Sequence, residues 1–434
     1  MTGDALVDQW SERSLSDIVE SAVDGPFGSN LKTEHYVDEP GVRVVRLQNI
    51  GNGEFSDSDR AWVSARHAQC LSRHGVQARD IVVASLGDDK HPVGRACLYP
   101  ETAPPGIVKA DCFRLRLDES IAVPGFVMRA LCCPATRIGL SGLSQGVTRD
   151  RVNLGNLLRF KVQLAPLAEQ RRIAEILDTL DEAIRKTEQV IAKLRQMKQG
   201  LLHDLLTRGI DDNGELRDPE RHPEQFKDSP LGRIPREWEV GPLLSRVTLP
   251  SGQLDPRVEP FRSWVLVAPD HIESGTGRLL DRRTAASQGA ISGKYGFSPA
   301  DVVYSKIRPY LRKAVLVDFA GLCSADMYPL HPSPALNPRF LLALILGEDF
   351  SRFAEGVSMR SGFPKINRDE LSEYAAAFPP RREQDAISQV LLELDHRQSS
   401  EEAALAKLRT LKQGLMDDLL TGRVRVPVPE EAEA

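Results

Sequence analysis

The side chains of this chain that could do chemistry are basic and aromatic, and they suit binding better than catalysis. The stretch 302–317 contains no acid, although it holds four bases and two tyrosines. Lysine and arginine neutralise phosphates, and neighbouring side chains reach base edges, so this pattern is typical of nucleic-acid binding. A strand-turn-strand with a solvated basic face is the plain alternative. The residues are Tyr304, Lys306, Arg308, Tyr310, Arg312 and Lys313.

Two other kinds of segment carry donors that suit phosphate. The loop 85–95 contains glycine and proline together with bases, and it could equally be an ordinary hairpin loop. The segments 145–151 and 358–365 place small residues and bases on the approach to each predicted long helix, which suits a phosphate seat, although a surface turn would look the same. The candidate nucleic-acid contacts are Lys90, His91, Arg95, Arg149, Arg151, Lys294, Lys306, Arg308, Tyr310, Arg312, Lys313, Arg360 and Lys365.

No catalytic motif accompanies these bases. The sequence has no P-loop, no Gly-rich dinucleotide fingerprint after a strand, and neither Asn-Pro-Pro-Tyr nor Asp-Pro-Pro-Tyr of an amino-methyltransferase. Pro269-Asp270 could begin a nuclease motif, but no Glu-x-Lys follows at a usable distance. The histidines and cysteines show no metal-ligand spacing. We therefore expect a binding protein with no catalytic site, metal or cofactor of its own.

Overall charge does not favour nucleic acid. The chain carries 56 Lys and Arg against 61 Asp and Glu, a net charge of −5. Residues 1–165 hold 19 bases and 20 acids, and residues 211–379 hold 21 and 23, so binding has to come from local patches. The sequence has no long apolar run and no secretory leader, and its cysteines are unpaired by spacing. These features predict a cytoplasmic protein without a membrane segment.

The chain repeats itself. Shifted by 214 residues, segment 166–207 lies on 380–421 without a gap, and 20 of the 42 positions are identical. Weaker matches continue upstream, where Asn153 falls on Asn367 at the same offset. The chain is therefore two copies of one unit of about 215 residues. The first, globular part of the unit has diverged between the copies, and its last segment has not.

The two similar segments predict long helices. Their apolar residues recur at steps of four and three, a period typical of a coiled-coil seam, although two ordinary core helices are the plainer alternative. Pro166 and Pro380 stand where a helix begins, and an acid follows in each first turn, where the helix dipole favours it. The seam residues are Ile173, Leu177, Leu180, Ile184, Ile191, Leu194, Leu201, Ile387, Leu391, Leu394, Leu405, Leu408 and Leu415.

The rest of each copy predicts a mixed α/β domain with short strands. We expect an α+β fold in which two such domains are separated by two long helices that form an antiparallel coiled coil, with a pseudo-twofold internal repeat. Helices are expected at 125–132 and 339–353, and the polar, proline-punctuated stretch 209–236 predicts a linker. The expected strands include 42–47, 81–84, 112–117, 264–267 and 302–304.

Several motifs together resemble the specificity subunit of a type I restriction-modification system over nearly the whole chain. Two of them resemble the start and end of that family's central conserved region, two its distal copy, and three the beginnings of its recognition domains. The motifs are Pro166-Leu-Ala-Glu-Gln170, Lys198-Gln-Gly-Leu-Leu202, Phe378-Pro-Pro-Arg-Arg-Glu-Gln384, Lys412-Gln-Gly-Leu415, Asp24-Gly-Pro-Phe-Gly-Ser29, Arg46-Leu-Gln-Asn-Ile50 and Asp228-Ser-Pro-Leu-Gly-Arg-Ile-Pro-Arg-Glu-Trp238.

The resemblance implies a non-catalytic subunit of a DNA adenine methyltransferase and restriction complex. Each target-recognition domain would read one half of a gapped, asymmetric double-stranded DNA target. The long helices would set the spacing and dock methyltransferase subunits, which restriction subunits could join. S-adenosylmethionine, ATP and Mg would bind to those partners. The implied segments are recognition domains at 1–157 and 238–371, long helices at 158–209 and 372–424, a linker at 210–237 and a flexible tail at 425–434.

Two other functions stay open from the residues alone. A coiled-coil scaffold would bind protein partners without reading DNA, and the basic stretch 302–317 argues mildly against it. A self-sufficient nuclease or methyltransferase is disfavoured by the missing motifs. One departure from strict repetition concerns the seam itself, because Gln398 and Glu401 stand in the second helix where the first has Ile184 and Thr187.

Overall fold

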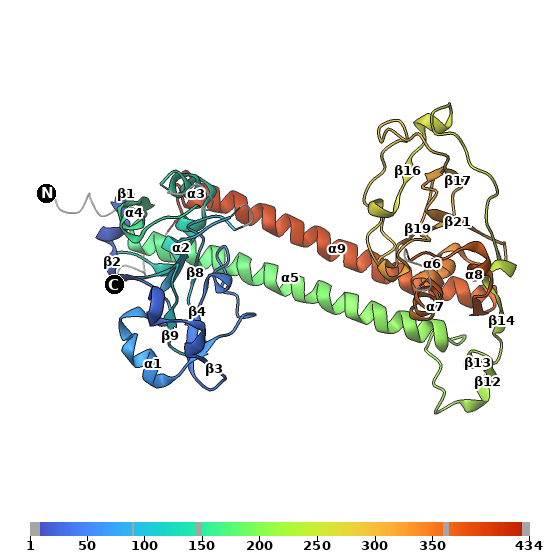
Figure 1. Cartoon of the computed structure of the whole chain (residues 1–434), viewed down its shortest axis with the longest axis horizontal. Coiled ribbons are helices and arrows are strands. Elements are labelled where there is room, and N and C mark those ends of the chain that lie inside the picture. Colours follow the sequence, from blue (N-terminus) through green and yellow to red (C-terminus); the bar gives the residue numbers. More distant parts are fainter. Residues whose placement is uncertain (1–8, 89–90, 144–149, 359–363, 428–434) are drawn as a thin grey trace. The chain divides into compact units, whose positions relative to one another are not determined.

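The computed structural model describes residues 9–88, 91–143, 150–358 and 364–427. Its contacts divide the chain into two compact units, which we call unit 1 (residues 1–188 and 403–434) and unit 2 (residues 189–402). Helix α5 (Leu167–Thr207) and helix α9 (Arg381–Leu419) each begin in one unit and end in the other (Figure 1). The sequence analysis predicted each long helix as a separate segment between the domains. In the structure, each long helix contributes part of its length to unit 1 and part to unit 2.

Unit 1 is built on two sheets and one strand pair. The first sheet is antiparallel, with strand order β2-β10-β7-β8, and the second has the order β3-β5-β4-β9-β6. Strand β1 (Ser11–Ser14) pairs with β11 (Lys161–Leu164). The remaining strands are β2 (Val19–Asp24), β3 (Tyr36–Val37), β4 (Val42–Val45), β5 (Trp62–Val63), β6 (Gly75–Val76), β7 (Ile81–Ala84), β8 (Ala96–Leu98), β9 (Gly106–Val108) and β10 (Cys112–Leu117).

The short helices of unit 1 cover its main core. Pro124 and Pro134 each stand in the first turn of a helix, where their fixed φ and missing N–H cause no loss. Phe126 and Leu131 of the first of these helices are fully buried in the same core as Leu115 of β10. The helices of unit 1 are α1 (Ala65–Cys70), α2 (Pro124–Cys132), α3 (Pro134–Ser141) and α4 (Leu154–Arg159).

Unit 2 repeats the central topology of unit 1. Its four-stranded sheet has the order β15-β21-β18-β19, and the pair β14–β22 corresponds to β1–β11. A three-stranded sheet, β16-β20-β17, and the hairpin β12–β13 complete the strands. The bounds are β12 (Phe226–Ser229), β13 (Gly232–Pro235), β14 (Glu239–Pro242), β15 (Val247–Thr248), β16 (Leu266–Val267), β17 (Tyr295–Phe297), β18 (Val302–Ser305), β19 (Ala314–Leu316), β20 (Gly321–Cys323), β21 (Met327–Pro332) and β22 (Ala375–Phe378), with helices α6 (Pro338–Leu346), α7 (Glu348–Ser358) and α8 (Arg368–Ser372).

Several segments differ from the sequence predictions, and strands β11 and β22 lie within the stretches 158–209 and 372–424 that were expected as long helices. The helix expected at 339–353 is two helices, α6 and α7, because Gly347 ends the first and acids begin the second, where the helix dipole favours them. The expected linker contains the β12–β13 hairpin, which is held by buried Phe226, Ile234 and Trp238. The expected flexible tail is ordered at its start, where Arg425 hydrogen-bonds Glu169.

A buried glutamine joins each long helix to its domain. Gln170 accepts a hydrogen bond from the backbone N–H of Val123 at 2.8 Å and donates to the carbonyl oxygen of Ala165 at 2.8 Å. Gln384 accepts from the N–H of Asn337 at 2.8 Å and donates to the carbonyl oxygen of Pro379 at 2.9 Å. Because these backbone groups are partly or fully removed from water, the glutamine stabilises the start of α2 or α6 against the base of the long helix.

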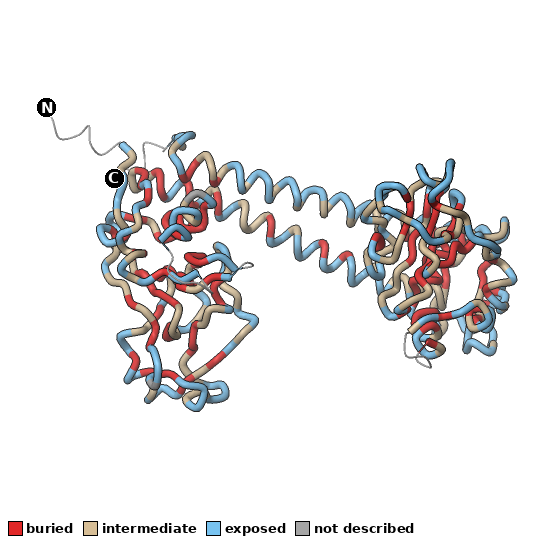
Figure 2. Tube along the Cα trace, turned by 45° about the horizontal axis from the view of Figure 1, so that its top comes forward, coloured by how far each residue is buried: buried red, intermediate tan, exposed pale blue. Residues whose placement is uncertain are grey.

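Within unit 1, the two long helices pack side by side and antiparallel. Asp181 of α5 pairs with Lys412 of α9, and Glu188 pairs with Arg409 at 2.6 Å, so residue numbers rise along one helix as they fall along the other. All seam residues in this unit are buried or partly buried. Figure 2 shows buried residues recurring at intervals along the helices, with exposed residues between them.

Within unit 2, the same two contacts recur at positions shifted by 214. Lys198 of α5 pairs with Asp395 of α9, and Arg195 pairs with Glu402 at 2.8 Å. Since 181 + 214 = 395 and 188 + 214 = 402, each acid of one unit has its counterpart in the other. The internal repeat therefore preserves the contacts between the helices as well as the residue types.

We expect Glu402→Gln to make the thermal stability of unit 2 less dependent on pH in the acidic range. Burial raises the pKa of Glu402, but hydrogen bonds from Gln398, Arg278 and Arg195 outweigh it and lower the pKa to about 2. A free glutamate titrates near pH 4.3, so the ionised group stabilises fully above that pH, and its contribution is lost as the pH falls toward 2. The variant should melt roughly 2–4 °C below the wild type at pH 7.

Thermal unfolding of the full chain between pH 2 and pH 7 measures this difference. The gap between variant and wild type should close as the pH falls below about 4. Glu401→Gln is the control, because Glu401 is the neighbouring acid and forms no ion pair with any residue that the structure describes. A gap that stays constant across this range would contradict the assignment.

Candidate nucleic-acid interface

The structure brings together, in each unit, two of the segments that the sequence selected. In unit 1 the loop after β7 meets the approach to α4 through a bridge between Leu86 and Arg151. In unit 2 the loop after β18 meets the approach to α8 through a bridge between Ile307 and Lys365. Because 151 + 214 = 365, the two bases occupy equivalent positions of the repeat. We call each of these places a loop junction.

The backbone hydrogen bonds of the two loop junctions are also equivalent. In unit 1, the N–H of Val152 donates to the carbonyl oxygen of Ser85 at 2.9 Å. In unit 2, the N–H of Ile366 donates to the carbonyl oxygen of Lys306 at 2.9 Å, and that of Arg308 to Pro364 at 2.8 Å. One backbone frame thus presents different side chains in the two units.

At the loop junction of unit 1, Arg151 is about half exposed and lies beside an aromatic ring. Its guanidinium carbon is 5.7 Å from the ring centre of Phe27, which is 47% exposed, and it pairs with Asp111 at 2.5 Å. Two other cations of unit 1, Arg46 and Lys109, lie over the ring of Tyr36 at 5.8 and 5.3 Å. Rings and cations of this kind suit contact with nucleotides.

At the loop junction of unit 2, two cations share aromatic neighbours. Lys306 lies 5.0 Å from the ring centre of Tyr328, and Arg368 lies 5.8 Å from the same ring and 6.0 Å from Tyr295. Sequence reasoning selected Lys306 but missed the other three residues. Arg368 is the first residue of α8, and the tyrosines come from β21 and β17, so only the fold brings them together.

The basic stretch 302–317 divides into outward and inward side chains. Arg308 and Arg312 both have φ of 49°, which makes the tight turn around Pro309–Leu311. Arg308 and Tyr310 are exposed, whereas Arg312 bonds the carbonyl oxygen of Leu346 and Lys313 bonds that of Pro269 at 2.6 Å. The inward pair holds the turn in place, so we keep only Arg308 and Tyr310 of these four as candidate contacts.

Two other candidates are buried. Arg95 is 7% exposed and donates to the carbonyl oxygens of Ile50 at 2.8 Å, Leu86 at 3.0 Å and Leu47 at 3.2 Å. Lys294 is 8% exposed and donates to Ser292. Burial lowers the pKa of both Arg95 and Lys294. The charges of Arg95 and Lys294 therefore hold loop structure. The sequence selected them because, in a single sequence, a buried base looks the same as an exposed one.

The remaining candidates fall into two groups. His91 is exposed and hydrogen-bonds the carboxylate of Asp88 at 3.1 Å. Lys90, Arg149 and Arg360 lie outside the described residues.

The described residues hold no group of three or more His, Cys, Asp or Glu that could bind a metal ion. Five of the six cysteines are buried, and burial raises the pKa of the Cys112 thiol to about 12, which disfavours the thiolate form that binds metals. Among the described helices, none has the length and apolar character that crossing a bilayer requires.

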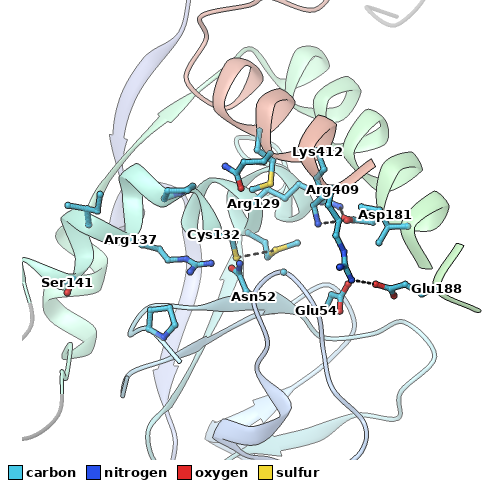
Figure 3. Close-up of a pocket in the computed structure, with 18 residues that line it drawn as sticks. Asn52, Glu54, Arg129, Cys132, Arg137, Ser141, Asp181, Glu188, Arg409 and Lys412 are labelled. Carbon is cyan, nitrogen blue, oxygen red and sulfur yellow. Dashed lines mark hydrogen bonds and ion pairs between the residues drawn. The ribbon is translucent and has the colours of Figure 1, made fainter. Parts of the chain in front are cut away.

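A cavity of about 720 Å³ in unit 1 lies where the domain meets the two long helices (Figure 3). Its bases are largely paired with acids: Arg129 bonds Asp181 at 3.0 Å, and Arg409 bonds Glu188 at 2.6 Å. In unit 2, Arg339 of α6 approaches Asp395 to 3.6 Å in the same way. Asp181 and Asp395 therefore each brace a domain helix against the long helices, and we assign the cavity no ligand.

Comparison with known proteins connects this architecture to one family. Residues 133–196 match the family model of the type I restriction modification DNA specificity domain. The chain is 30% identical over 304 residues to the type I restriction enzyme EcoDI specificity subunit of Escherichia coli, covering 64% of this chain and 66% of that subunit. It is 22% identical over 452 residues to the EcoKI specificity subunit of E. coli K12, covering 98% and 91%.

A further relative is the MjaVIII specificity subunit of Methanocaldococcus jannaschii, at 24% identity over 61% of this chain and 62% of that subunit. The aligned parts thus span slightly less than two thirds of the EcoDI and MjaVIII subunits. Among solved structures, the S subunit of the M. genitalium type I system matches with a TM-score of 0.57 and 13% identity, covering 97% of this chain and 98% of that one. The resemblance to specificity subunits predicted from the motifs is confirmed.

Proposed function

We propose that this chain, a type I restriction-modification specificity subunit by its similarities, recognises a bipartite double-stranded DNA target, with one half read by each unit. The observation that carries the proposal is the pair of loop junctions. They share one backbone frame, bridged at Leu86–Arg151 and Ile307–Lys365, but they present different side chains. A common frame with different side chains is what two different half-sites require.

The cations and rings at the junctions suit the two tasks of DNA recognition. Arg151, Arg308 and Lys365 would neutralise phosphates, which fixes register without specifying sequence. Phe27 and Tyr310 are exposed rings at or beside the junctions, which suits contacts with base edges and thymine methyl groups. The near-neutral total charge then matters little, because the charge is concentrated locally.

In this proposal the long helices determine the gap in the target. Helix α5 has 41 residues and α9 has 39, and at 1.5 Å per residue each is roughly 60 Å long. A gapped target whose halves lie about one helical turn, roughly 34 Å, apart needs a spacer of fixed length. Methylation and cleavage would belong to partner subunits, which would also bind S-adenosylmethionine, ATP and Mg.

The outer surface of the helices offers a docking site for those partners. Met197 and Leu411 are equivalent positions and are 60% and 51% exposed. Three residues further on, Gly200 and Gly414 lie inside the helices, and a Cβ at either would meet nothing within 4 Å. Glycine within a helix costs about 1 kcal/mol relative to alanine, and no contact within the chain requires it here. We propose that a methyltransferase subunit approaches the helix backbone at each glycine.

We expect Arg308→Ala and Lys365→Ala to weaken binding to all duplexes about equally. Each removes one phosphate contact, so the slope of log K against log salt should fall by roughly 1. Fluorescence anisotropy of labelled duplexes, with the assembled methyltransferase and a salt series, measures both quantities. Arg221→Ala is the control, since Arg221 is 83% exposed and distant in sequence from the junction. Loss of discrimination at one base pair with an unchanged slope would instead mark a base-reading residue.

We expect an exchange of residues 11–164 with the matching part of a related chain to change one half of the methylated target only. This segment carries both β1 and β11, so their pairing moves as one piece. Sequencing of methylated adenines in a host with the complete system reads the target directly. A simultaneous change in both halves would show that the units do not read DNA independently.

We expect Met197→Glu and Leu411→Glu each to remove one docked methyltransferase subunit, because a charge would then face an apolar partner surface. The mass of the assembly, measured by light scattering with purified methyltransferase, checks this outcome. The matched controls are Gln196→Glu and Thr410→Glu, which place the same charge on the neighbouring exposed residue of each helix. Full assembly of both test variants would rule out docking at these sites.

A further inference from the structure

A buried carboxylate at the base of α5 gathers parts of unit 1 that are far apart in the chain. Glu169 is 2% exposed and accepts a hydrogen bond from the indole N–H of Trp10 at 3.1 Å. It also accepts bonds from the Nε of Arg425 at 2.9 Å and from the backbone N–H of Val426 at 3.1 Å. Arg425 follows the end of α9, the long helix of the other copy of the repeat.

Unit 2 builds the same site from the other copy. Glu383, at the base of α9, is 6% exposed and accepts from the indole N–H of Trp238 at 3.1 Å. It accepts from the guanidinium of Arg217 at 2.5 Å and from the backbone N–H of Ile210 at 3.1 Å. Arg217 follows the end of α5. We call each set of tryptophan, glutamate and arginine a clamp.

A glycine turn delivers each arginine to its clamp. Gly422 and Gly209 follow the two helices with φ of +71° and +61°, a region that favours glycine. A Cβ at Gly422 would lie 3.1 Å from the ring of Trp10, and one at Gly209 would lie 2.1 Å from the carboxylate of Glu383. The two arginines stand three and eight residues beyond their glycines, since 425 − 422 = 3 and 217 − 209 = 8. The segments that follow α9 and α5 thus differ in length, but both supply an arginine and a backbone N–H to the glutamate of their clamp.

The tryptophan of each clamp directly precedes a strand at the start of its domain. Trp10 directly precedes β1, which pairs with β11, and its ring packs edge-on against Phe126 of α2 at 5.9 Å. Trp238 directly precedes β14, which pairs with β22. A carboxylate that is ionised, buried and saturated with donors holds its neighbours in a narrow geometry. Burial raises the pKa of Glu169, but the bonds from Arg425 and its other donors outweigh this and lower the pKa.

We propose that Arg425 and Arg217 are positioning residues for DNA reading, each for the unit that contains it and not for the copy of the repeat in which it is encoded. The proposal rests on the function proposed above. Arg425 fixes Glu169 and Trp10, and through them β1 and α2 of the domain that would read the first half-site. Arg217 does the same for the second. A substitution of Arg425, which is encoded in the second copy of the repeat, should therefore affect recognition by the domain of unit 1.

The test replaces Arg425 by Ala in the full chain and measures two properties. Hydrogen exchange of the free protein should become faster in β1 and β11 while β14 and β22 stay unchanged. In a host with the complete system, methylation at targets with one mismatch should increase by roughly tenfold when the mismatch lies in the first half-site, since one mismatched base pair typically weakens binding by a factor of that order. Mismatches in the second half-site should remain rejected.

The chain offers matched controls. Arg423→Ala removes a guanidinium two residues away that bonds Asp418 and not the clamp, and it should change neither property. Arg425→Lys keeps the charge and should restore most of the fidelity. Arg217→Ala should give the mirror result, with faster exchange in β14 and β22 and relaxed reading of the second half-site, against Arg221→Ala as its control.

The outcomes separate the clamp from the proposed function. Equal loss of fidelity in both half-sites for Arg425→Ala, or faster exchange with no loss of fidelity, would overturn the positioning role. No change in exchange would overturn the clamp itself. Failure of the wild type to methylate any bipartite target would refute the proposed function, and the exchange measurement would still decide whether Arg425 holds unit 1 together.

Discussion

A helix of about 40 residues with an apolar stripe has to bury that stripe along its whole length, and the architecture of each unit follows from this requirement. The chain meets it by supplying a second helix of nearly the same length and repeating the contacts between them, Asp181 with Lys412 and Asp395 with Lys198. Many positions that face the other helix or the domain are thereby alike in both copies, although Gln398 and Glu401 depart from Ile184 and Thr187. Exposed side chains on the loops between strands carry no such constraint and differ between the copies.

The repeat, the long helices and many short strands were predictable because each depends on local pattern. Strand β10 has the bounds that alternation and β-branched or aromatic content predicted. The candidate interface was predictable only in part. The bases at 151 and 365 were selected because they precede the predicted long helices, but the structure places them before the short helices α4 and α8. Arg368, Tyr295 and Tyr328 meet through tertiary structure alone. The burial of Arg95 and Lys294 could not be predicted from their residue types.

Charge has two separate uses in this chain. Buried or half-buried acids such as Glu169, Asp181 and Glu402 are saturated with donors and hold the helices and domains together. Partly exposed bases near the loop junctions have rings beside them, as with Lys306 and Tyr328. The same total of charges can therefore give a nearly neutral protein with a rigid interior and local positive surfaces.

The division of the chain between the units also has a consequence for its biosynthesis. Unit 2 is one continuous stretch, residues 189–402, whereas unit 1 needs residues 403 onward to complete its helix pair and its clamp. A ribosome therefore releases every part of unit 2 before the second helix of unit 1 has been translated. Until then, the apolar stripe at Ile173 and Leu177 lacks Met416 and Leu419, with which it shares a core. The first domain to be made is the last to be finished, and nascent chains pass through a state in which its exposed helix is open to chaperones or to premature association.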